Sequence, residues 1–189
     1  HWEEPCISGA KGSGAVFFTG CSLKCVFCQN YEISTEKSVG KVLQIEELNE
    51  LFFRLVEQGA QNINLVNPTH FAPAICEALQ LRHLPVPVVY NSGGYETVET
   101  LQKMEGLVDI YLPDLKYATG TIAERYSGAE NYVEFARSAI LEMVRQTGPV
   151  QFDEDGMLLR GTVIRHLILP GHTRESMGVL DWIKQELDG

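Results

Sequence analysis

The sequence predicts an α/β fold, a partial (β/α) barrel of the TIM type with about five to six βα units. Short apolar runs alternate with amphipathic stretches, a pattern typical of βαβ units around a parallel sheet. The chain has 189 residues, whereas a closed eight-stranded barrel takes about 250 residues. A truncated barrel that forms one domain over residues 1–189 therefore fits the length better than a closed one.

Short apolar runs bounded by glycine, asparagine or proline predict the first four main strands. These strands are expected over residues 15–19, 63–66, 86–90 and 108–112. A fifth main strand is expected over residues 162–169, where Pro170 and Gly171 end it. Turn residues between the runs 150–152 and 157–159 indicate a hairpin that leaves the main sheet.

Helices are predicted between these strands. Apolar residues recur at three- and four-residue steps over residues 45–58, which predicts an amphipathic helix that ends at Gly59. Further helices are expected over residues 70–82, 96–104, 130–146 and 173–187. In such folds the chemistry belongs at the carboxyl ends of the strands.

Composition and charge exclude several classes of protein. Hydrophobic residues make up 44% of the chain and charged residues 21%, which suits a folded protein rather than a disordered one. The net charge of -10 argues against a general nucleic-acid-binding surface. No apolar run predicts a membrane span or a secretory signal, so a cytoplasmic protein is expected. The chain begins with His1 rather than Met, and we expect a fragment that lacks flanking segments.

Three of the five cysteines lie within eight residues of one another. The odd total and the lack of a secretory signal argue against a disulfide framework. Cys21, Cys25 and Cys28 have the spacing C-x3-C-x2-C and directly follow the first predicted strand. Three thiolates on one short loop can hold three irons of a [4Fe–4S] cluster and leave the fourth iron open.

Two other interpretations of the cysteines stay open. A structural zinc site takes four ligands, usually as two spaced pairs, and here the second pair is missing. Incidental thiols are the other alternative, which the close spacing disfavours. Cys6 is expected to be a loop thiol that could add a ligand only if the chain folded back, and Cys76 is expected in a buried helix position.

The cysteine motif resembles that of the radical S-adenosylmethionine enzymes, C-x3-C-x-aromatic-C after the first barrel strand, with Phe27 as the aromatic residue. The resemblance implies that S-adenosylmethionine chelates the open iron and is cleaved reductively to a 5′-deoxyadenosyl radical, which abstracts hydrogen. It also implies a reduced flavodoxin or ferredoxin-type electron donor. The cofactors would supply the chemistry, while the protein binds them and excludes water.

Further segments resemble the pyruvate formate-lyase-activating-enzyme-like proteins, namely residues 14–21, 28–33, 114–116 and 164–171. This resemblance implies hydrogen abstraction from a partner, a glycyl radical protein. Modification of another protein or a small molecule is an alternative within the same class. A non-catalytic iron–sulfur or zinc protein, such as an electron carrier, is the alternative from another class, and polar residues at the strand ends argue against it.

Polar residues after the second and third strands are candidates for binding S-adenosylmethionine. Asn67 and Thr69 stand where the family usually has a Gly-Gly-Glu-like segment, but they offer no carboxylate, and helix capping is an equal alternative. Asn91 and Ser92 end the third strand and suit the ribose or the methionyl carboxylate. A plain strand-to-helix turn uses the same residue types.

Charged candidates end the fourth and fifth strands. Asp114 and Lys116 are two residues apart, so an extended chain points both to one face, where they suit the zwitterionic methionine moiety. A surface ion pair is the alternative. Arg165 is similar to the strand-five arginine of the activating enzymes, and a guanidinium can hold the cofactor carboxylate through two hydrogen bonds. His166 should point to the opposite face and is expected to be structural.

Overall fold

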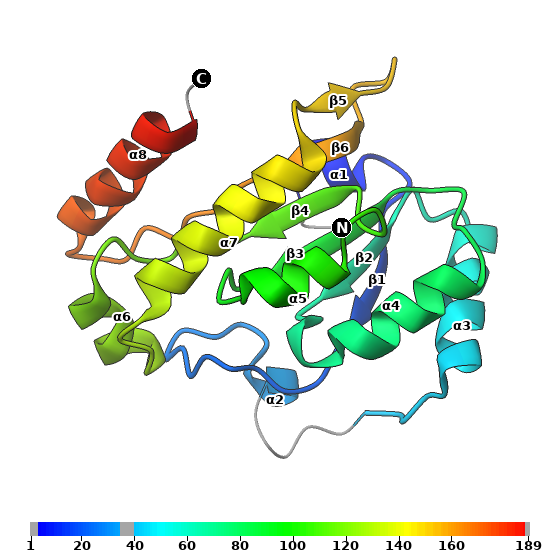
Figure 1. Ribbon diagram of the computed structural model, residues 1–189, viewed down its shortest axis with the longest axis horizontal. Coiled ribbons are helices and arrows are strands. Elements are labelled where there is room, and N and C mark those ends of the chain that lie inside the picture. The colour runs from blue at the N-terminus through cyan, green and yellow to red at the C-terminus, as the bar shows by residue number, and fades with distance from the viewer. Residues whose placement is uncertain (1–3, 35–39, 188–189) are drawn as a thin grey trace.

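The computed structural model describes residues 4–34 and 40–187. Its centre is a six-stranded sheet with the strand order β1-β2-β3-β4-β6-β5 (Figure 1). Five strands pair in parallel, namely β1 (Gly14–Phe17), β2 (Ile63–Val66), β3 (Val88–Ser92), β4 (Ile110–Pro113) and β6 (Leu158–Thr162). The short β5 (Gln151–Phe152) is antiparallel to β6. Within the described residues the sheet does not close, so the prediction of an α/β fold with an open, partial barrel is confirmed.

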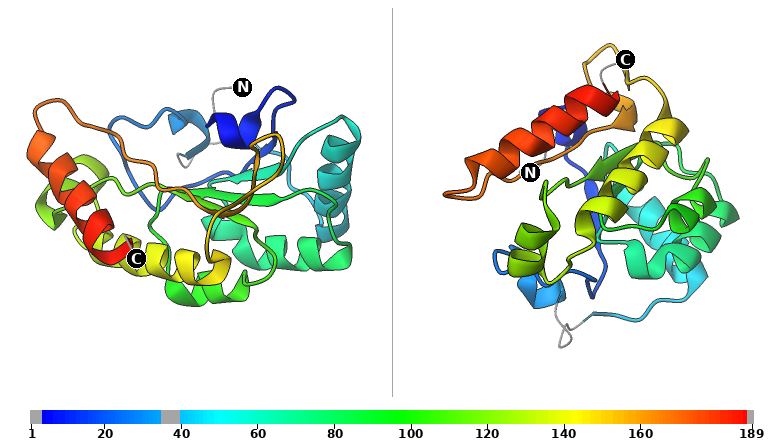
Figure 2. Two further views of the ribbon diagram at one scale, coloured as in Figure 1. Left: turned by 90° about the horizontal axis from the view of Figure 1, so that it is seen from above. Right: turned by 60° about the vertical axis from the view of Figure 1, so that its left-hand side comes forward.

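Helices cover mainly one face of the sheet (Figure 2). Those on this face are α3 (Ile45–Glu57), α4 (Ala72–Leu81), α5 (Val98–Lys103) and α7 (Tyr132–Thr147). The opposite face carries α1 (Pro5–Ser8). The remaining helical segments are α2 (Tyr31–Ser34), the 3₁₀ turn η1 (Thr69–Phe71), α6 (Gly120–Ser127) and α8 (Thr173–Leu187). None of the helices that the structure describes is both long enough and apolar enough to cross a membrane.

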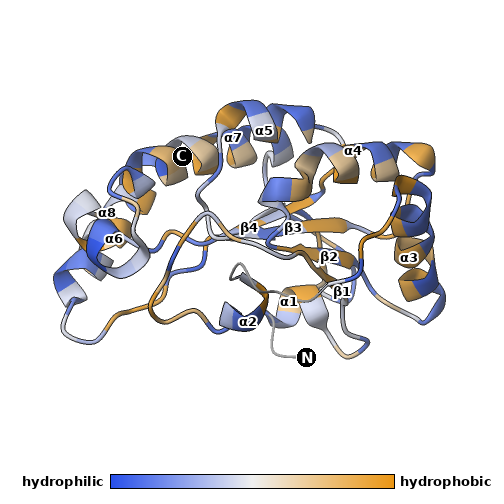
Figure 3. Cartoon of the chain, turned by 90° about the horizontal axis from the view of Figure 1, so that it is seen from below, coloured by the Kyte–Doolittle hydropathy of each residue, from blue (hydrophilic) through white to orange (hydrophobic). Residues whose placement is uncertain are grey.

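The main core lies between the sheet and the helical layer. Every residue of β2, β3 and β4 is buried, as is typical of central strands in a parallel sheet. Figure 3 shows apolar residues concentrated in these central strands. On the opposite face Ile7 of α1 packs against Val89, Ile110 and Leu112. This small second core places the N-terminal segment against β3 and β4.

Several predicted elements agree closely with the structure. The strand over residues 63–66 and the helix over residues 173–187 are confirmed at both ends, and the helix over residues 45–58 is confirmed to within one residue. The third strand begins and ends two residues later than predicted. Asn91 and Ser92 are therefore the last residues of β3 rather than the turn after it.

The prediction of a hairpin outside the main sheet is wrong. β5 and β6 do form a hairpin, but β6 also pairs in parallel with β4, where Gly161 lies opposite Ile110. The fifth main strand thus begins at Leu158, not at Thr162. The segment after β6 continues along β4 through an isolated bridge between Asp114 and Arg165. A short apolar run shows that a strand is present but not which partner it pairs with.

Three short helices are absent from the sequence prediction. These are α1, α2 and α6. Helices of four to eight residues show few periods of an apolar repeat, and their formation depends on tertiary contacts. Cys6 therefore lies in α1 and not in a loop, whereas Cys76 is buried in α4 as expected.

Candidate cofactor site

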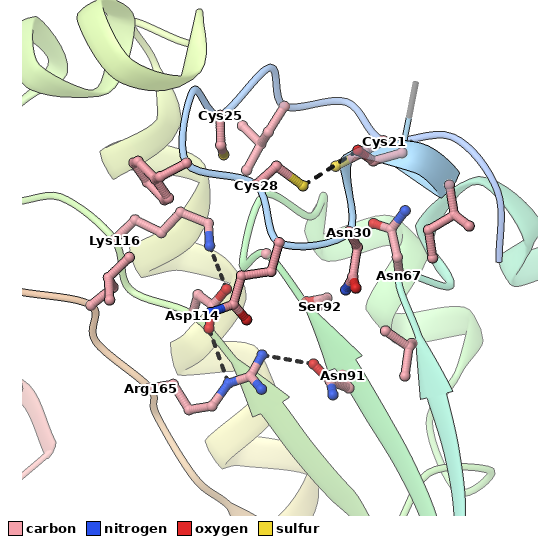
Figure 4. A pocket seen from close by; sticks show the side chains of 18 of the residues that line it. Cys21, Cys25, Cys28, Asn30, Asn67, Asn91, Ser92, Asp114, Lys116 and Arg165 are labelled. Carbon is pink, nitrogen blue, oxygen red and sulfur yellow. Dashed lines mark hydrogen bonds and ion pairs between the residues drawn. The ribbon is translucent and has the colours of Figure 1, made fainter. Parts of the chain in front are cut away.

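A cavity of about 410 Å³ lies at the carboxyl ends of the parallel strands (Figure 4). This volume is in the usual range for small-molecule sites. Its walls come from the cysteine loop, from the ends of β2, β3 and β4, and from the segment after β6. With the exception of Thr69, the cavity brings together all of the predicted site residues, which are Cys21, Cys25, Phe27, Cys28, Asn67, Asn91, Ser92, Asp114, Lys116 and Arg165.

The cysteine loop is fixed by backbone hydrogen bonds. The N–H of Cys28 donates to the carbonyl of Cys25 over 3.1 Å, which closes a tight turn between these two residues. The N–H groups of Lys24 and Val26 donate to carbonyls at the end of α6, each over 2.9 Å. All three thiols are free of disulfides and partly buried. The loop thus holds three sulfur atoms on one wall of the cavity.

The chemistry of these donors fits an iron–sulfur cluster. Burial raises the pKa of the Cys21 thiol, and negative charge on Cys25 and Cys28 raises it further, while a backbone N–H and Lys116 act in the opposite direction. A bound metal cation would offset this effect and favour the thiolate form of Cys21. Among the described residues no three His, Cys, Asp or Glu side chains are close enough to share a single ion. A [4Fe–4S] cluster does not need such a group, because each thiolate binds a different iron.

The wall opposite the cysteines carries a network of charges. The Asp114 carboxylate pairs with the Lys116 ammonium and lies 3.0 Å from Nε of Arg165, measured from Oδ1. Nη2 of Arg165 donates to Oδ1 of Asn91 over 2.7 Å, and Glu4 is a more distant partner, with Oε1 at 4.0 Å from Nε. The side chains of Lys116 and Asp114 are only 14% and 22% exposed. The pair therefore lies in the cavity wall and not on the outer surface.

Asn67 links the end of β2 to the cysteine loop. Its φ of 59° is in the left-handed region, which few residues other than glycine adopt, and this turn directs the chain away from the strand. Its side-chain amide donates to the carbonyl of Gly20, the residue before Cys21. Thr69 instead donates its hydroxyl to Oε1 of Glu96 over 2.7 Å and does not line the cavity. Neither side chain caps η1, whose N-cap position is Pro68.

Glu96 is a buried carboxyl group that the sequence analysis missed. Its side chain accepts hydrogen bonds from Thr69 and, over 3.2 Å, from the Tyr90 hydroxyl, and the residue is only 2% exposed. Burial raises the pKa of Glu96 to about 7, although hydrogen bonds from Thr69, Tyr90 and Ser92 act in the opposite direction. A single glutamate two positions after Gly94 has no sequence signal that separates a buried position from an exposed one.

Glu96 makes stability depend on pH. Its raised pKa means that the folded protein holds the proton more tightly than the unfolded chain, so the stabilisation is present below pH 4.5 and is lost as the pH rises through about 7. The free energy of unfolding should therefore fall by about 2–3 kcal/mol more between pH 5 and pH 8 in the unsubstituted protein than in Glu96→Gln. Urea unfolding of both metal-free proteins at these two values measures this difference, and parallel pH dependence would contradict it.

His166 lies beside the cavity but is held by the fold. Its Nδ1 is 2.7 Å from the carbonyl of Leu115, and its Nε2 is 2.8 Å from the hydroxyl of Ser176 in α8. Both ring nitrogens thus join the segment after β6 to its neighbours, which is compatible with the expected structural role. His166 nevertheless lines the same cavity as Arg165, so the expectation that it points away from the cofactor space is wrong. The cavity also includes residues that the sequence did not single out, namely Leu23, Gln29, Asn30, Ile33, Ser34, Val66, Gly93 and Leu167.

Comparison with known proteins gives three findings. The family model described as the Radical SAM superfamily matches residues 15–183. The uncharacterized protein MJ0674 of Methanocaldococcus jannaschii is 30% identical over 184 residues, a match that covers 93% of this chain and 50% of that protein. The chain thus spans about half the length of this curated relative. The crystal structure of Streptococcus suis SuiB bound to the precursor peptide SuiA has a TM-score of 0.61 at 9% identity, over 93% of this chain and 37% of that one, which supports the fold alone.

Proposed function

Because the chain belongs to the radical SAM superfamily, we propose that it is an enzyme that cleaves S-adenosylmethionine reductively at the cavity described above. The family implies a [4Fe–4S] cluster and S-adenosylmethionine as cofactors. When bound, these cofactors would supply one-electron reductive cleavage of the sulfonium and abstraction of a hydrogen atom from the substrate. The observation that carries the proposal is the position of three free thiols opposite a wall of charged side chains in one cavity.

Cys21, Cys25 and Cys28 would hold three irons and leave the fourth iron for S-adenosylmethionine. The other two cysteines of the chain are remote from the cavity, because Cys6 packs with the small core around α1 and Cys76 lies in α4 with Sγ 3.0 Å from Sδ of Met104. We therefore expect no fourth ligand from Cys6 or Cys76. An iron with an open coordination position is what a chelating cofactor requires.

The charged wall suits the methionine end of S-adenosylmethionine. Arg165 and Lys116 would bind the carboxylate, and Asp114 would accept hydrogen bonds from the amino group. Asn67 and Ser92 border the same space and offer neutral hydrogen-bonding groups to the amino group or the ribose. Phe27 lines the same cavity and would help to exclude water from the reacting atoms.

The hydrogen donor is proposed from the sequence resemblance. We propose a glycyl residue of a partner protein as the donor and a reduced flavodoxin or ferredoxin-type protein as the electron source. Modification of another protein or of a small molecule is the alternative within the same class of chemistry. Incubation with a glycyl radical protein that carries deuterium on the glycine Cα should yield deuterated 5′-deoxyadenosine. Cleavage of S-adenosylmethionine without deuterium transfer would show that the glycine is not the hydrogen donor, while the proposed reductive cleavage would still stand.

Binding of S-adenosylmethionine to the cluster can be measured without any substrate. After anaerobic reconstitution and reduction with dithionite, the cluster should give an electron paramagnetic resonance signal, and S-adenosylmethionine should change the shape and position of that signal. Methionine added alone at the same concentration serves as the control for non-specific effects. Zinc in place of the cluster would give neither the signal nor visible charge-transfer absorption, and this outcome would overturn the proposed function.

A further inference from the structure

The thiol of Cys25 receives a hydrogen bond from a fully buried side chain. Oγ of Ser127, at the end of α6, donates to Sγ of Cys25 over 2.9 Å, and Ser127 is only 1% exposed. The hydroxyl near Cys28 is different, since Oγ of Ser34 lies 3.4 Å from that sulfur and Ser34 is only half-buried. Ser127 therefore offers a short hydrogen bond to one cluster ligand in a position shielded from water.

The surrounding structure fixes Ser127 in place. The carbonyl of Ser127 accepts a hydrogen bond from the N–H of Lys24, and the preceding carbonyl accepts one from the N–H of Val26, so two backbone bonds flank Cys25 on the loop. The Ser127 hydroxyl also contacts the hydroxyl of Tyr117, a residue that is 1% exposed and follows β4. The contact with Cys25 thus does not depend on a flexible side chain.

The direction of these hydrogen bonds follows from the charge on sulfur. A cysteine that ligates iron is a thiolate, which has no hydrogen to donate, so the single hydroxyl hydrogen of Ser127 must point to Cys25. Ser127 can then only accept from Tyr117, whose hydroxyl is the donor. The three residues therefore form a directed relay from Tyr117 through Ser127 to Cys25.

We propose that this relay raises the reduction potential of the cluster and so makes the reduced state easier to reach. The inference rests on the proposed function, because it requires a cluster on Cys25. Reduction adds one electron, supplied by a flavodoxin- or ferredoxin-type donor or by dithionite, and no proton needs to move. Hydrogen bonds to the ligating sulfurs stabilise this added negative charge, and the effect is strong where water is excluded. Ser127 is thus a positioning and tuning residue that acts through Cys25.

The test is a potentiometric titration of the reconstituted cluster without S-adenosylmethionine. The midpoint potential should become more negative in Ser127→Ala. It should shift in the same direction by a smaller amount in Tyr117→Phe, which keeps Ser127 but removes the hydroxyl that donates to it. Ser34→Ala is the matched control near Cys28, and its shift should be smaller than that of Ser127→Ala. Ser127→Thr retains a hydroxyl and should restore the potential.

Each outcome decides the inference. Unchanged potentials in both Ser127→Ala and Tyr117→Phe would overturn it while the cluster and the proposed function stand. Ser127→Ala could fail to assemble a cluster, and Tyr117→Phe then decides. An unchanged midpoint potential in Tyr117→Phe would overturn the inference and would mean that Ser127 only holds the cysteine loop in place. A more negative potential in Tyr117→Phe supports the inference even then. If the unsubstituted protein assembles no cluster, both the inference and the proposed function fail.

Discussion

Replacement of Cys21, Cys25 or Cys28 by alanine is expected to abolish the [4Fe–4S] cluster and all cleavage of S-adenosylmethionine. The cavity wall contains no other thiol that could replace a lost ligand, and soft thiolate donors are what iron–sulfur clusters require. Iron and sulfide content after anaerobic reconstitution, together with the charge-transfer absorption, measures the loss. An unaltered cluster in Cys25→Ala would show that the ligand assignment is wrong.

The two remaining cysteines provide matched controls. Cys6→Ala and Cys76→Ala should retain the full cluster, because neither side chain lines the cavity. Cys76 is buried with its sulfur near Met104, so its replacement is expected to affect stability rather than iron content. Loss of the cluster in Cys6→Ala would instead show that this residue moves to become a fourth ligand.

Arg165→Ala is expected to weaken the binding of S-adenosylmethionine by about 10- to 150-fold while the cluster still assembles. A hydrogen bond to a charged group contributes about 1.5–3 kcal/mol, which corresponds to this change in affinity. Arg165 is already oriented by Asp114 and Asn91, so its guanidinium does not need to be ordered when the carboxylate of the cofactor binds. Isothermal titration of the reconstituted protein measures the effect.

Two further variants test the assignment of the charged wall. Lys116→Ala should weaken binding less than Arg165→Ala, because an ammonium acts as a single flexible charge rather than a planar fork. His166→Ala should reduce stability more than affinity, since both ring nitrogens are bonded within the fold. If Arg165→Ala binds S-adenosylmethionine as tightly as the unsubstituted protein while His166→Ala binds it weakly, then His166 rather than Arg165 contacts the cofactor and the assignment is wrong.

Local patterns in the sequence predicted the elements whose stability depends on local features. The run over residues 63–66 is mostly apolar, and it forms β2 as predicted, with every residue buried. Asn91 and Ser92 suggested a turn because they are polar, but β3 includes them, since its parallel neighbours supply their backbone partners. The position of β6 could not be predicted, because its pairing with β4 joins segments about fifty residues apart in the chain. The periodicity of apolar residues within a segment does not indicate which distant strand it pairs with.

The same distinction applies to the site. The cysteine spacing and the Asp114–Lys116 pair lie within short segments, so residue spacing alone placed them together. The ion pair between Arg165 and Asp114 depends on the register between β4 and the segment after β6, which only the folded structure defines. Ser127 contacts Cys25 across 102 residues of sequence. No local pattern identifies a serine at the end of a short helix as the partner of a distant thiol.

The most direct test of the central claim is an assay for 5′-deoxyadenosine. The protein is reconstituted anaerobically with iron and sulfide, reduced with dithionite and incubated with S-adenosylmethionine, and Cys25→Ala is treated in the same way as the matched control. We predict that the unsubstituted protein forms 5′-deoxyadenosine and methionine in equal amounts and that Cys25→Ala forms neither. If the unsubstituted protein contains a complete [4Fe–4S] cluster but forms no more 5′-deoxyadenosine than Cys25→Ala, the account is contradicted.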